Sequence, residues 1–531
     1  MTWVNELDNF LKEANFDEAL ALYKKRDHMQ LVQYPIETRA MLRARCLVCE
    51  VLDYAGLYKQ SGDVINDVGI TAQRELKREQ EANNIISNSI PLLKQQCWAC
   101  LHLGMFYYRS HNLKQAQECF QLSKSVLTMV HRTHPSYMSL ARAHYCLGLV
   151  ARNDHKYDIA REHFSRSVEI ASEGLGHLSE GRSSSALQYD IGKCLGLGMG
   201  WVAYTRASLS DALAHVVAAR LLLKDKKIRF IHSYIDVIHA CTLMSSHADE
   251  IIPLKEAISI LEKAFKVLGG KEALSNDGGH GVYALRAAGE LALAHLRCMR
   301  IYDKQKQEGS KKESRKKTIA YITMIKESKV AQTERRTWCD ALICESRMFR
   351  QTNPQSALRS AKDALKGAPN DGSKIDCHIA IGEAYYYSKQ YKHAIKEFSD
   401  ARSIDGAQTN PKVLAVCDLH LTRCYVAIGD LNRAKEHIAL WESGGRRGSE
   451  NAFVRELETE VRISLESGKA PFFIPAAAKL NPTQWRLELH WWLANNAIRR
   501  ANGNREEAAD KILHITRRTL EDWLKRKTTT R

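Results

Sequence analysis

The chain has 531 residues, too many for one ordinary globular domain, and its content of 44% hydrophobic and 26% charged residues is typical of a soluble folded protein. Only ten prolines occur, which disfavours an all-β fold with its many Pro and Gly turns and favours an all-helical one. Lys and Arg exceed Asp and Glu by 17, and this excess indicates an acidic partner, most commonly nucleic acid.

The N-terminal segment, MTWVNELDNFLKEANF, is acidic and amphipathic and lacks the basic start and apolar core of a signal peptide. No run of 18 apolar residues occurs, so we expect a cytoplasmic protein with no membrane partner, associated with the nucleoid if it is bound to DNA. The fourteen cysteines are scattered through helical patterns, including the C-x2-C pairs Cys46/Cys49 and Cys97/Cys100. We therefore predict buried thiols in a reducing compartment and no zinc or other metal site.

An internal repeat dominates residues 1–467. A repeat unit of two antiparallel helices needs a small residue where the helices cross and larger apolar residues where neighbouring units stack. Three segments have this spacing, three others follow it loosely, and Phe16, Ala19 and Tyr23 look like the second half of a further unit. The well-matched copies are Leu103-Gly104, Tyr107, Ala116, Phe120; Leu147-Gly148, Ala151, Ala160, Phe164, Ser167; and Ile381-Gly382, Tyr385, Ala394, Phe398, Ala401. The loose copies are Gly200, Ala212, Ala219; Ala357, Ala361, Ala364, Pro369; and Tyr425, Ala434, Trp441.

These segments resemble the tetratricopeptide family, over about four fifths of the chain. The resemblance implies an all-α fold, a tetratricopeptide-like helical-repeat superhelix, over residues 1–467. Such arrays bind partners and do not catalyse reactions. Their concave groove is lined by the first helix of each unit and commonly holds a peptide or a protein partner. Polar candidates for that groove are Arg109, Asn112, Arg152, Asn153 and Arg206.

Two polar stretches interrupt the pattern. Residues 303–317 (DKQKQEGSKKESRKK) hold seven Lys or Arg and three acidic residues around a Gly-Ser pair. We predict a solvated loop between helices here, with an arm that contacts phosphate as the alternative. Residues 443–449 (SGGRRGS) are predicted to form a flexible turn between helices.

The composition changes after Gly468, where residues 468–480 are rich in proline and predict an extended linker. A helix is expected to begin after Asn481, with Pro482 at its first position. This helix carries two apolar stripes, and one is enough for the domain's own core. The second stripe predicts burial against a copy of the same domain in a homodimer, or against the array; its members are Leu487, Trp491, Ala494 and Ile498, of which Leu487, Trp491 and Ile498 are the large ones.

Two more helices are predicted before the end of the chain. Asn504 and Glu507 form a capping box before the small residues Ala508 and Ala509, and a tight turn leads to a last helix capped by Thr516. A helix with small residues, a tight turn and a basic helix together indicate a small helix-turn-helix domain over residues 481–531. From residue 479 to the end there are twelve Lys or Arg against six Asp or Glu, a net charge of +6.

The string GNREEAADKILHITRRTLEDWLKRK resembles the C-terminal DNA-binding domain of the Fis family. The resemblance implies that the start of the last helix reads base edges and that flanking cations contact phosphates. The chain departs from the family pattern by one extra residue before Ile515, by His514 in place of a turn glycine, and by the acidic Glu521 and Asp522. The residues expected to bind DNA are Thr516, which caps the last helix, and Arg517, Arg518 and Thr519, which begin that helix and reach base edges. Those expected at phosphates are Lys525, Arg526, Lys527 and Arg531, with Arg499, Arg500 and Arg505 adding to them.

The sequence thus favours a bacterial DNA-binding transcriptional regulator, whose array binds a peptide or protein and whose helix-turn-helix binds DNA. The alternative is a scaffold whose array organises a multiprotein complex, with the C-terminal domain as a protein dock. The chain has no G-x4-GK[ST] loop, no G-x-S-x-G and no H-E-x-x-H motif, so we expect neither enzymatic activity nor a cofactor.

Overall fold

The computed structural model describes residues 2–25, 39–55, 57–82, 90–110, 112–154, 156–177, 182–226, 228–247, 250–275, 280–408, 410–443 and 451–467, together with Glu506 and Arg518. Within these ranges the chain forms helices and short connections and no β-strand, so the predicted all-α fold class is confirmed. The chain divides into two compact units, residues 1–417 with 444–455, and residues 418–443 with 456–531. None of the helices in the described part combines the length and the apolar character needed to cross a membrane.

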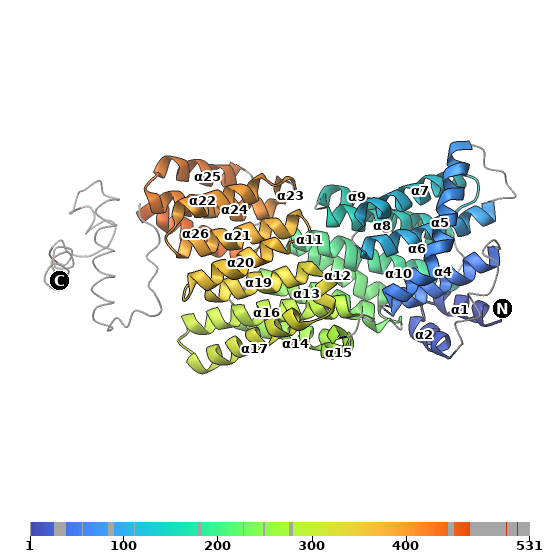
Figure 1. The fold of residues 1–531 in the computed structure, drawn as a ribbon, viewed down its shortest axis with the longest axis horizontal. Coiled ribbons are helices and arrows are strands. Elements are labelled where there is room, and N and C mark those ends of the chain that lie inside the picture. The colour runs from blue at the N-terminus through green and yellow to red at the C-terminus, as the bar shows by residue number, and fades with distance from the viewer. Residues whose placement is uncertain are drawn as a thin grey trace. The chain divides into compact units, whose positions relative to one another are not determined.

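The first unit is a helical-repeat array in which consecutive helices pack against each other (Figure 1). Its helices are α1 (Thr2–Lys12), α2 (Phe16–Lys24), α4 (Arg39–Tyr54), α5 (Tyr58–Ala82), α6 (Ile90–Arg109), α7 (Leu113–His131), α8 (Tyr137–Asn153), α9 (Tyr157–His177), α10 (Arg182–Lys193), the π-helix η2 (Cys194–Gly200), α11 (Trp201–Thr205), α12 (Leu209–Leu223), α13 (Arg229–Ser246), α14 (Ile251–Val267), α15 (Gly270–Ser275), α16 (Gly281–Lys304), α17 (Glu308–Glu327), α18 (Val330–Thr333), α19 (Arg335–Phe349), α20 (Pro354–Lys366), α21 (Asp371–Tyr387), α22 (Tyr391–Ser403), α23 (Asp405–Gln408) and the first part of α24 (Pro411–Ile428).

A contact between a glycine of one helix and a phenylalanine ring of the next sets how closely the two helices cross in the best-matched pairs. At Gly148 of α8, an added Cβ would lie 2.6 Å from the ring of Phe164 in α9, closer than atoms can approach without a shift. The glycine therefore lets the two helices pack with the ring directly between them. The same contact joins Gly104 with Phe120 and Gly382 with Phe398. All three predicted repeat copies are thus confirmed as helix pairs.

The loose copies also form helices whose small residues face inward. The alanines of α12 and α20 that belong to the repeat pattern are fully buried, and Trp441 of the third loose copy is almost fully buried. At the N-terminus, α2 buries Phe16, Ala19 and Tyr23 as the second helix of a pair with α1. All fourteen cysteines are buried free thiols, so the prediction of buried thiols is confirmed.

The prediction of a loop at residues 303–317 is wrong. Helix α16 continues to Lys304, and α17 begins at Glu308, so most of this basic stretch is helical. Gly309 and Ser310 lie in the first turn of α17, where their low helix propensity costs less than in the helix interior, and Glu308 is favourable near the positive end of the helix dipole. Ser314 and Thr318 supply the buried face, so the charged residues are the solvated side of a helix.

The second unit contains the rest of α24, α25 (Leu431–Ser443) and the rest of α26 (Ala452–Ser467). His437 Nδ1 lies 3.1 Å from Asp418 Oδ1, and Arg423 pairs with Glu460 at 3.1 Å. The predicted turn at 443–449, the linker at 468–480 and the domain boundaries drawn from them fall almost entirely outside the described residues, and they stay predictions.

Candidate functional site

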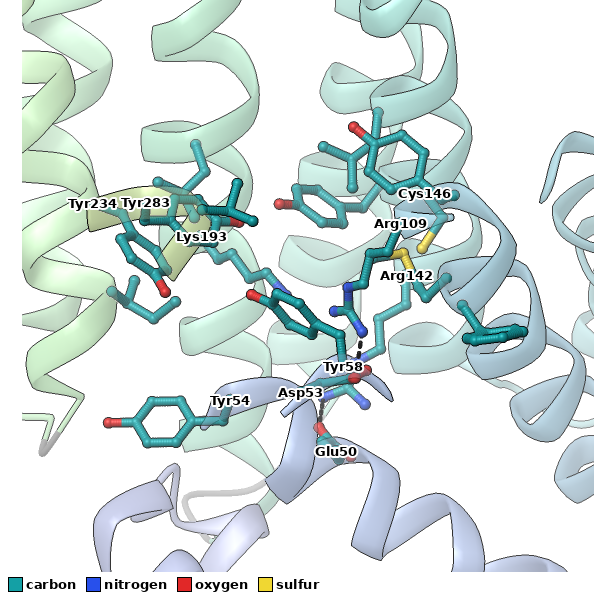
Figure 2. Close-up of a pocket in the computed structure, with 18 of the residues that line it drawn as sticks. Glu50, Asp53, Tyr54, Tyr58, Arg109, Arg142, Cys146, Lys193, Tyr234 and Tyr283 are labelled. Atoms are coloured by element: carbon teal, nitrogen blue, oxygen red, sulfur yellow. Dashed lines mark hydrogen bonds and ion pairs between the residues drawn. The ribbon is translucent and has the colours of Figure 1, made fainter. Parts of the chain in front are cut away.

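A cavity of about 750 Å³ lies within the first unit, walled by helices far apart in the sequence (Figure 2). Helices α4, α6, α8, α10, α13 and α16 all contribute side chains to its wall. Its volume falls within the range of cavities that hold small ligands or short segments of a larger one. The array therefore encloses a preformed space and not only a packed core.

Arg142 of α8 holds together three helices at the cavity wall. Its Nη2 lies 2.8 Å from Glu50 Oε1 in α4, and its Nε donates to Asp190 Oδ2 in α10 at 2.8 Å. All three side chains are largely buried. A planar guanidinium can bind two carboxylates at once, which a lysine ammonium does with less geometric definition.

A second ion pair joins Arg109 of α6 to Asp53 of α4. The Arg109 guanidinium also stacks over the ring of Tyr58 at 4.0 Å, and His102 Nδ1 lies 3.5 Å from Asp53 Oδ2. Burial alone would raise the pKa of Asp53, but Arg109 and His102 together hold it well below its usual range. Asp53 is thus an ionised carboxylate whose negative charge is already balanced by its neighbours.

The π-helix η2, with the glycine-rich sequence CLGLGMG, contributes Leu197 to the wall. Arg152 of α8 donates from Nη1 to the carbonyl oxygen of Leu197 in η2 at 2.9 Å. Short π-helical turns occur frequently at functional sites because they place backbone groups and side chains where an α-helix would not. The repeat pattern in the sequence does not predict this element.

Lys193, the last residue of α10, extends into the cavity (Figure 2). Its Nζ lies 5.0 Å from the ring centre of Tyr145 and 5.7 Å from that of Tyr189. Burial lowers the pKa of Lys193, and Asp190 opposes that effect only in part. Among the described residues, no carboxylate forms an ion pair with it.

Seven tyrosines line the cavity, each from a different helix. Tyr234 of α13 and Tyr283 of α16 stack with their ring centres 3.6 Å apart. Tyrosine gives a large flat apolar face and one polar atom, a combination that suits recognition surfaces. The other five are Tyr54, Tyr58, Tyr108, Tyr145 and Tyr189.

Three of the five polar residues proposed for the groove line this cavity: Arg109, Arg152 and Asn153. The other two have local structural roles. Asn112 caps α7 by accepting a hydrogen bond from the Gln115 amide, and Arg206 pairs with Asp158. Sequence reasoning missed Arg142, Lys193 and the tyrosines, because their spacing along the chain carries no local signal.

The residues proposed for the C-terminal domain lie outside the described part of the chain, with one exception. Arg518 is described, and it is helical and exposed. The remaining residues stay predictions: Thr516, Arg517, Thr519, Arg499, Arg500, Arg505, Lys525, Arg526, Lys527 and Arg531 for DNA, and Leu487, Trp491, Ala494 and Ile498 for dimerisation or docking.

Lowering the pH from 7 to 5 is expected to destabilise the array. Burial lowers the pKa of His280 to about 3 and that of His295 to about 4, so both are neutral when folded. Below pH 6.5 the unfolded chain binds protons that the folded chain does not, and stability falls as the pH falls toward those values. At pH 5 each histidine accounts for about 2 kcal/mol of lost stability.

Amide hydrogen exchange in α16, which begins after His280 and contains His295, measures this loss at the two pH values once the intrinsic exchange rates are corrected for pH. The His280→Phe variant, which keeps a ring beside Phe230, should lose about 2 kcal/mol less than the native chain. The exposed control His134→Gln should show the native pH dependence. An unchanged pH dependence in His280→Phe would show that this histidine is not the titrating group.

No protein-family model matches the sequence, and no curated protein matches it. Among solved structures, a Rap protein in complex with competence and sporulation factor is 13% identical and covers 77% of this chain and 98% of its own, with a TM-score of 0.49. Aspartyl phosphate phosphatase F from Bacillus subtilis is 14% identical, with coverages of 76% and 94% and a TM-score of 0.42. Yeast Tom70 is 12% identical, with coverages of 87% and 95% and a TM-score of 0.37. At these identities and scores the similarities assign no function to the chain.

Proposed function

We propose that the chain is an interaction scaffold, whose helical array receives a segment of a peptide or protein partner in its cavity. The observation that supports this most directly is the preformed cavity of about 750 Å³, walled by aromatic and charged side chains from many helices. Helical arrays bind extended or helical segments because each repeat adds a strip of side chains to one continuous inner surface. Aromatic and arginine side chains are the types that carry most of the binding energy in such contacts.

A substitution that fills the cavity tests this proposal. The native full-length chain would select binders from a random peptide library displayed on phage. The selected peptides are expected to lose binding to Val282→Trp, because Val282 lines the cavity and a tryptophan there occupies it. The control Ile252→Trp changes a residue that is 77% exposed on α14, and it should bind the same peptides as the native chain. Equal binding by both variants, or no enrichment of peptides, would contradict the proposal.

A DNA-binding regulator is the second candidate, supported by the sequence of residues 481–531. Its support is the resemblance to the Fis family and the net charge of +6 near the C-terminus. In this candidate the chain binds DNA as a dimer through the stripe that contains Trp491, and the two copies read half-sites about one helical turn apart. Occupation of the array by its partner would then change whether both copies reach DNA together.

Two single substitutions are expected to separate base contact from phosphate contact. Arg517→Ala should weaken binding to the preferred DNA sequence by about 1–3 kcal/mol and relax specificity at one position. Lys525→Ala should weaken binding to all sequences alike. It should also reduce, by about one, the slope of the logarithm of the binding constant against the logarithm of the salt concentration. Fluorescence anisotropy on DNA selected by the native chain, over a salt series, measures both effects.

The control for these measurements is a chain that ends at residue 474. If this truncated chain binds DNA as the native chain does, or if native binding does not depend on salt, the helix-turn-helix assignment is wrong. Equal effects of the two substitutions would place the recognition helix elsewhere.

A further inference from the structure

The charges of the cavity do not balance. Six cationic and four carboxylate side chains line it, so cations exceed carboxylates by two. Every one of the four carboxylates is already paired with an arginine. Arg142 pairs with Glu50 and Asp190, Arg109 pairs with Asp53, and Arg286 lies 3.7 Å from Glu334.

Lys193 and Lys59 are the two lysines of the wall, and they differ in environment. Lys59 is exposed at the cavity's edge and is solvated by water. Lys193 is partly buried, and Asp190, the carboxylate that most raises its pKa, accepts its hydrogen bond from Arg142 instead. Its ammonium lies 5.0 Å from the ring centre of Tyr145 and 5.7 Å from that of Tyr189.

An ammonium that leaves water without a counter-ion loses solvation free energy. Contacts with the faces of aromatic rings offset this loss only in part. An anion that enters the cavity would therefore gain a charge-assisted hydrogen bond from Lys193 without having to displace a carboxylate of the protein. A cation would meet an excess of positive charge.

The surroundings of Lys193 also define the rest of the ligand. Tyr145 and Tyr189 flank the ammonium, and the stacked pair Tyr234 and Tyr283 adds a further flat apolar face to the same wall. Flat rings pack well on such faces in offset or edge-on arrangements. We propose that the cavity binds an aromatic organic anion, with its acidic group on Lys193 and its ring among the tyrosines.

This inference rests on the proposed function, because it takes the cavity as the binding site and specifies what that site recognises. The acidic aromatic group can be a small free acid or the end of a peptide. Both sources share the same chemistry, and a competition experiment distinguishes them.

Two fluorescent probes of the same shape test the proposal on the full chain. One is 8-anilinonaphthalene-1-sulfonate, an aromatic anion, and the other is N-phenyl-1-naphthylamine, its uncharged counterpart without the sulfonate. Lys193→Met is expected to weaken binding of the anionic probe about tenfold or more, because a hydrogen bond to a charged group is lost. Binding of the uncharged probe should stay unchanged, which also shows that the cavity of the variant is folded.

Lys312→Met is the control, because it removes an exposed lysine of α17 that does not line the cavity. It should bind both probes as the native chain does. If Lys193→Met leaves the anionic probe unaffected, or weakens both probes equally, the assignment of an anion to Lys193 is overturned. If Val282→Trp leaves both probes bound, the cavity is not the site, and the proposed function fails separately.

Competition against the anionic probe then identifies the source of the acidic group. Phenylacetate is expected to displace the probe if the ligand is a small acid. Acetyl-Ala-Ala-Phe with a free carboxylate is expected to displace it if the ligand is a peptide end. The same peptide with an amidated end should not compete, and equal competition by the amide would overturn the proposal.

Discussion

Replacing Arg142 with methionine is expected to destabilise the array by about 3–5 kcal/mol. The substitution leaves Glu50 and Asp190 with side chains only 14% and 9% exposed and without their counter-ion. Removing one partner of a buried ion pair costs this much because the remaining charge is neither solvated nor neutralised. Here one arginine serves two carboxylates, so both are left unpaired.

The effect should be local to the helices that Arg142 joins. A long repeat array does not have to unfold as one cooperative unit, so a single unfolding transition can hide such an effect. Amide hydrogen exchange in α4, α8 and α10 measures it directly, and protection should fall there more than in α19 to α22. Arg166→Met is the control, because its partner Glu169 is exposed and an exposed pair contributes about 0–1 kcal/mol.

Neutralising the two carboxylates separates charge from packing. The triple variant Arg142→Met, Glu50→Gln, Asp190→Asn contains no unpaired charge at this place, and much of the lost protection should return. If the triple variant is as unprotected as Arg142→Met alone, the loss comes from the packing of the arginine stem, and the electrostatic explanation is wrong.

The repeat was readable in the sequence because its determinants are local. Gly148 and Phe164 are sixteen residues apart within one helix pair, and the same spacing recurs at Gly104 and Gly382. A short pattern of this kind can be recognised without knowledge of the rest of the fold. The first-helix lining of the groove followed from the same pattern, which is why Arg109 and Arg152 could be proposed.

The cavity itself could not be predicted, because its residues come together only in three dimensions. Arg142 meets Glu50 and Asp190, which are 92 and 48 positions from it. A single tyrosine on a helix predicts an ordinary core residue, and only stacking of several helix pairs makes such residues face one another. The prediction of a loop at residues 303–317 was wrong for the opposite reason. Its composition is typical of a loop, but two buried hydroxyl residues and the packing of α17 on α16 outweigh local propensity.

Phe164→Ala is expected to destabilise the array by about 3–5 kcal/mol, because the ring is completely buried and its removal leaves a cavity. Two glycines face the ring. An added Cβ would lie 2.6 Å from it at Gly148 and 2.8 Å from it at Gly198 of η2. The ring therefore sets the distance between α9 and two other elements, one of which is the π-helix in the cavity wall. We expect the uncharged naphthylamine probe to bind Phe164→Ala more weakly than the native chain.

A double substitution tests whether a glycine is needed at position 148 because of its contact with the Phe164 ring. Gly148→Ala alone should cost about 1–3 kcal/mol, because its Cβ forces the ring or the helix to move. In the Phe164→Ala background the same methyl group enters the space that the ring has left, so its cost should vanish or turn into a gain. The two substitutions are then non-additive, as residues in contact usually are. Additive losses, measured by hydrogen exchange in α8 and α9, would mean that Gly148 is needed for the backbone of α8 and not for its contact with Phe164, and the packing rule that defines these repeats would not hold at this pair.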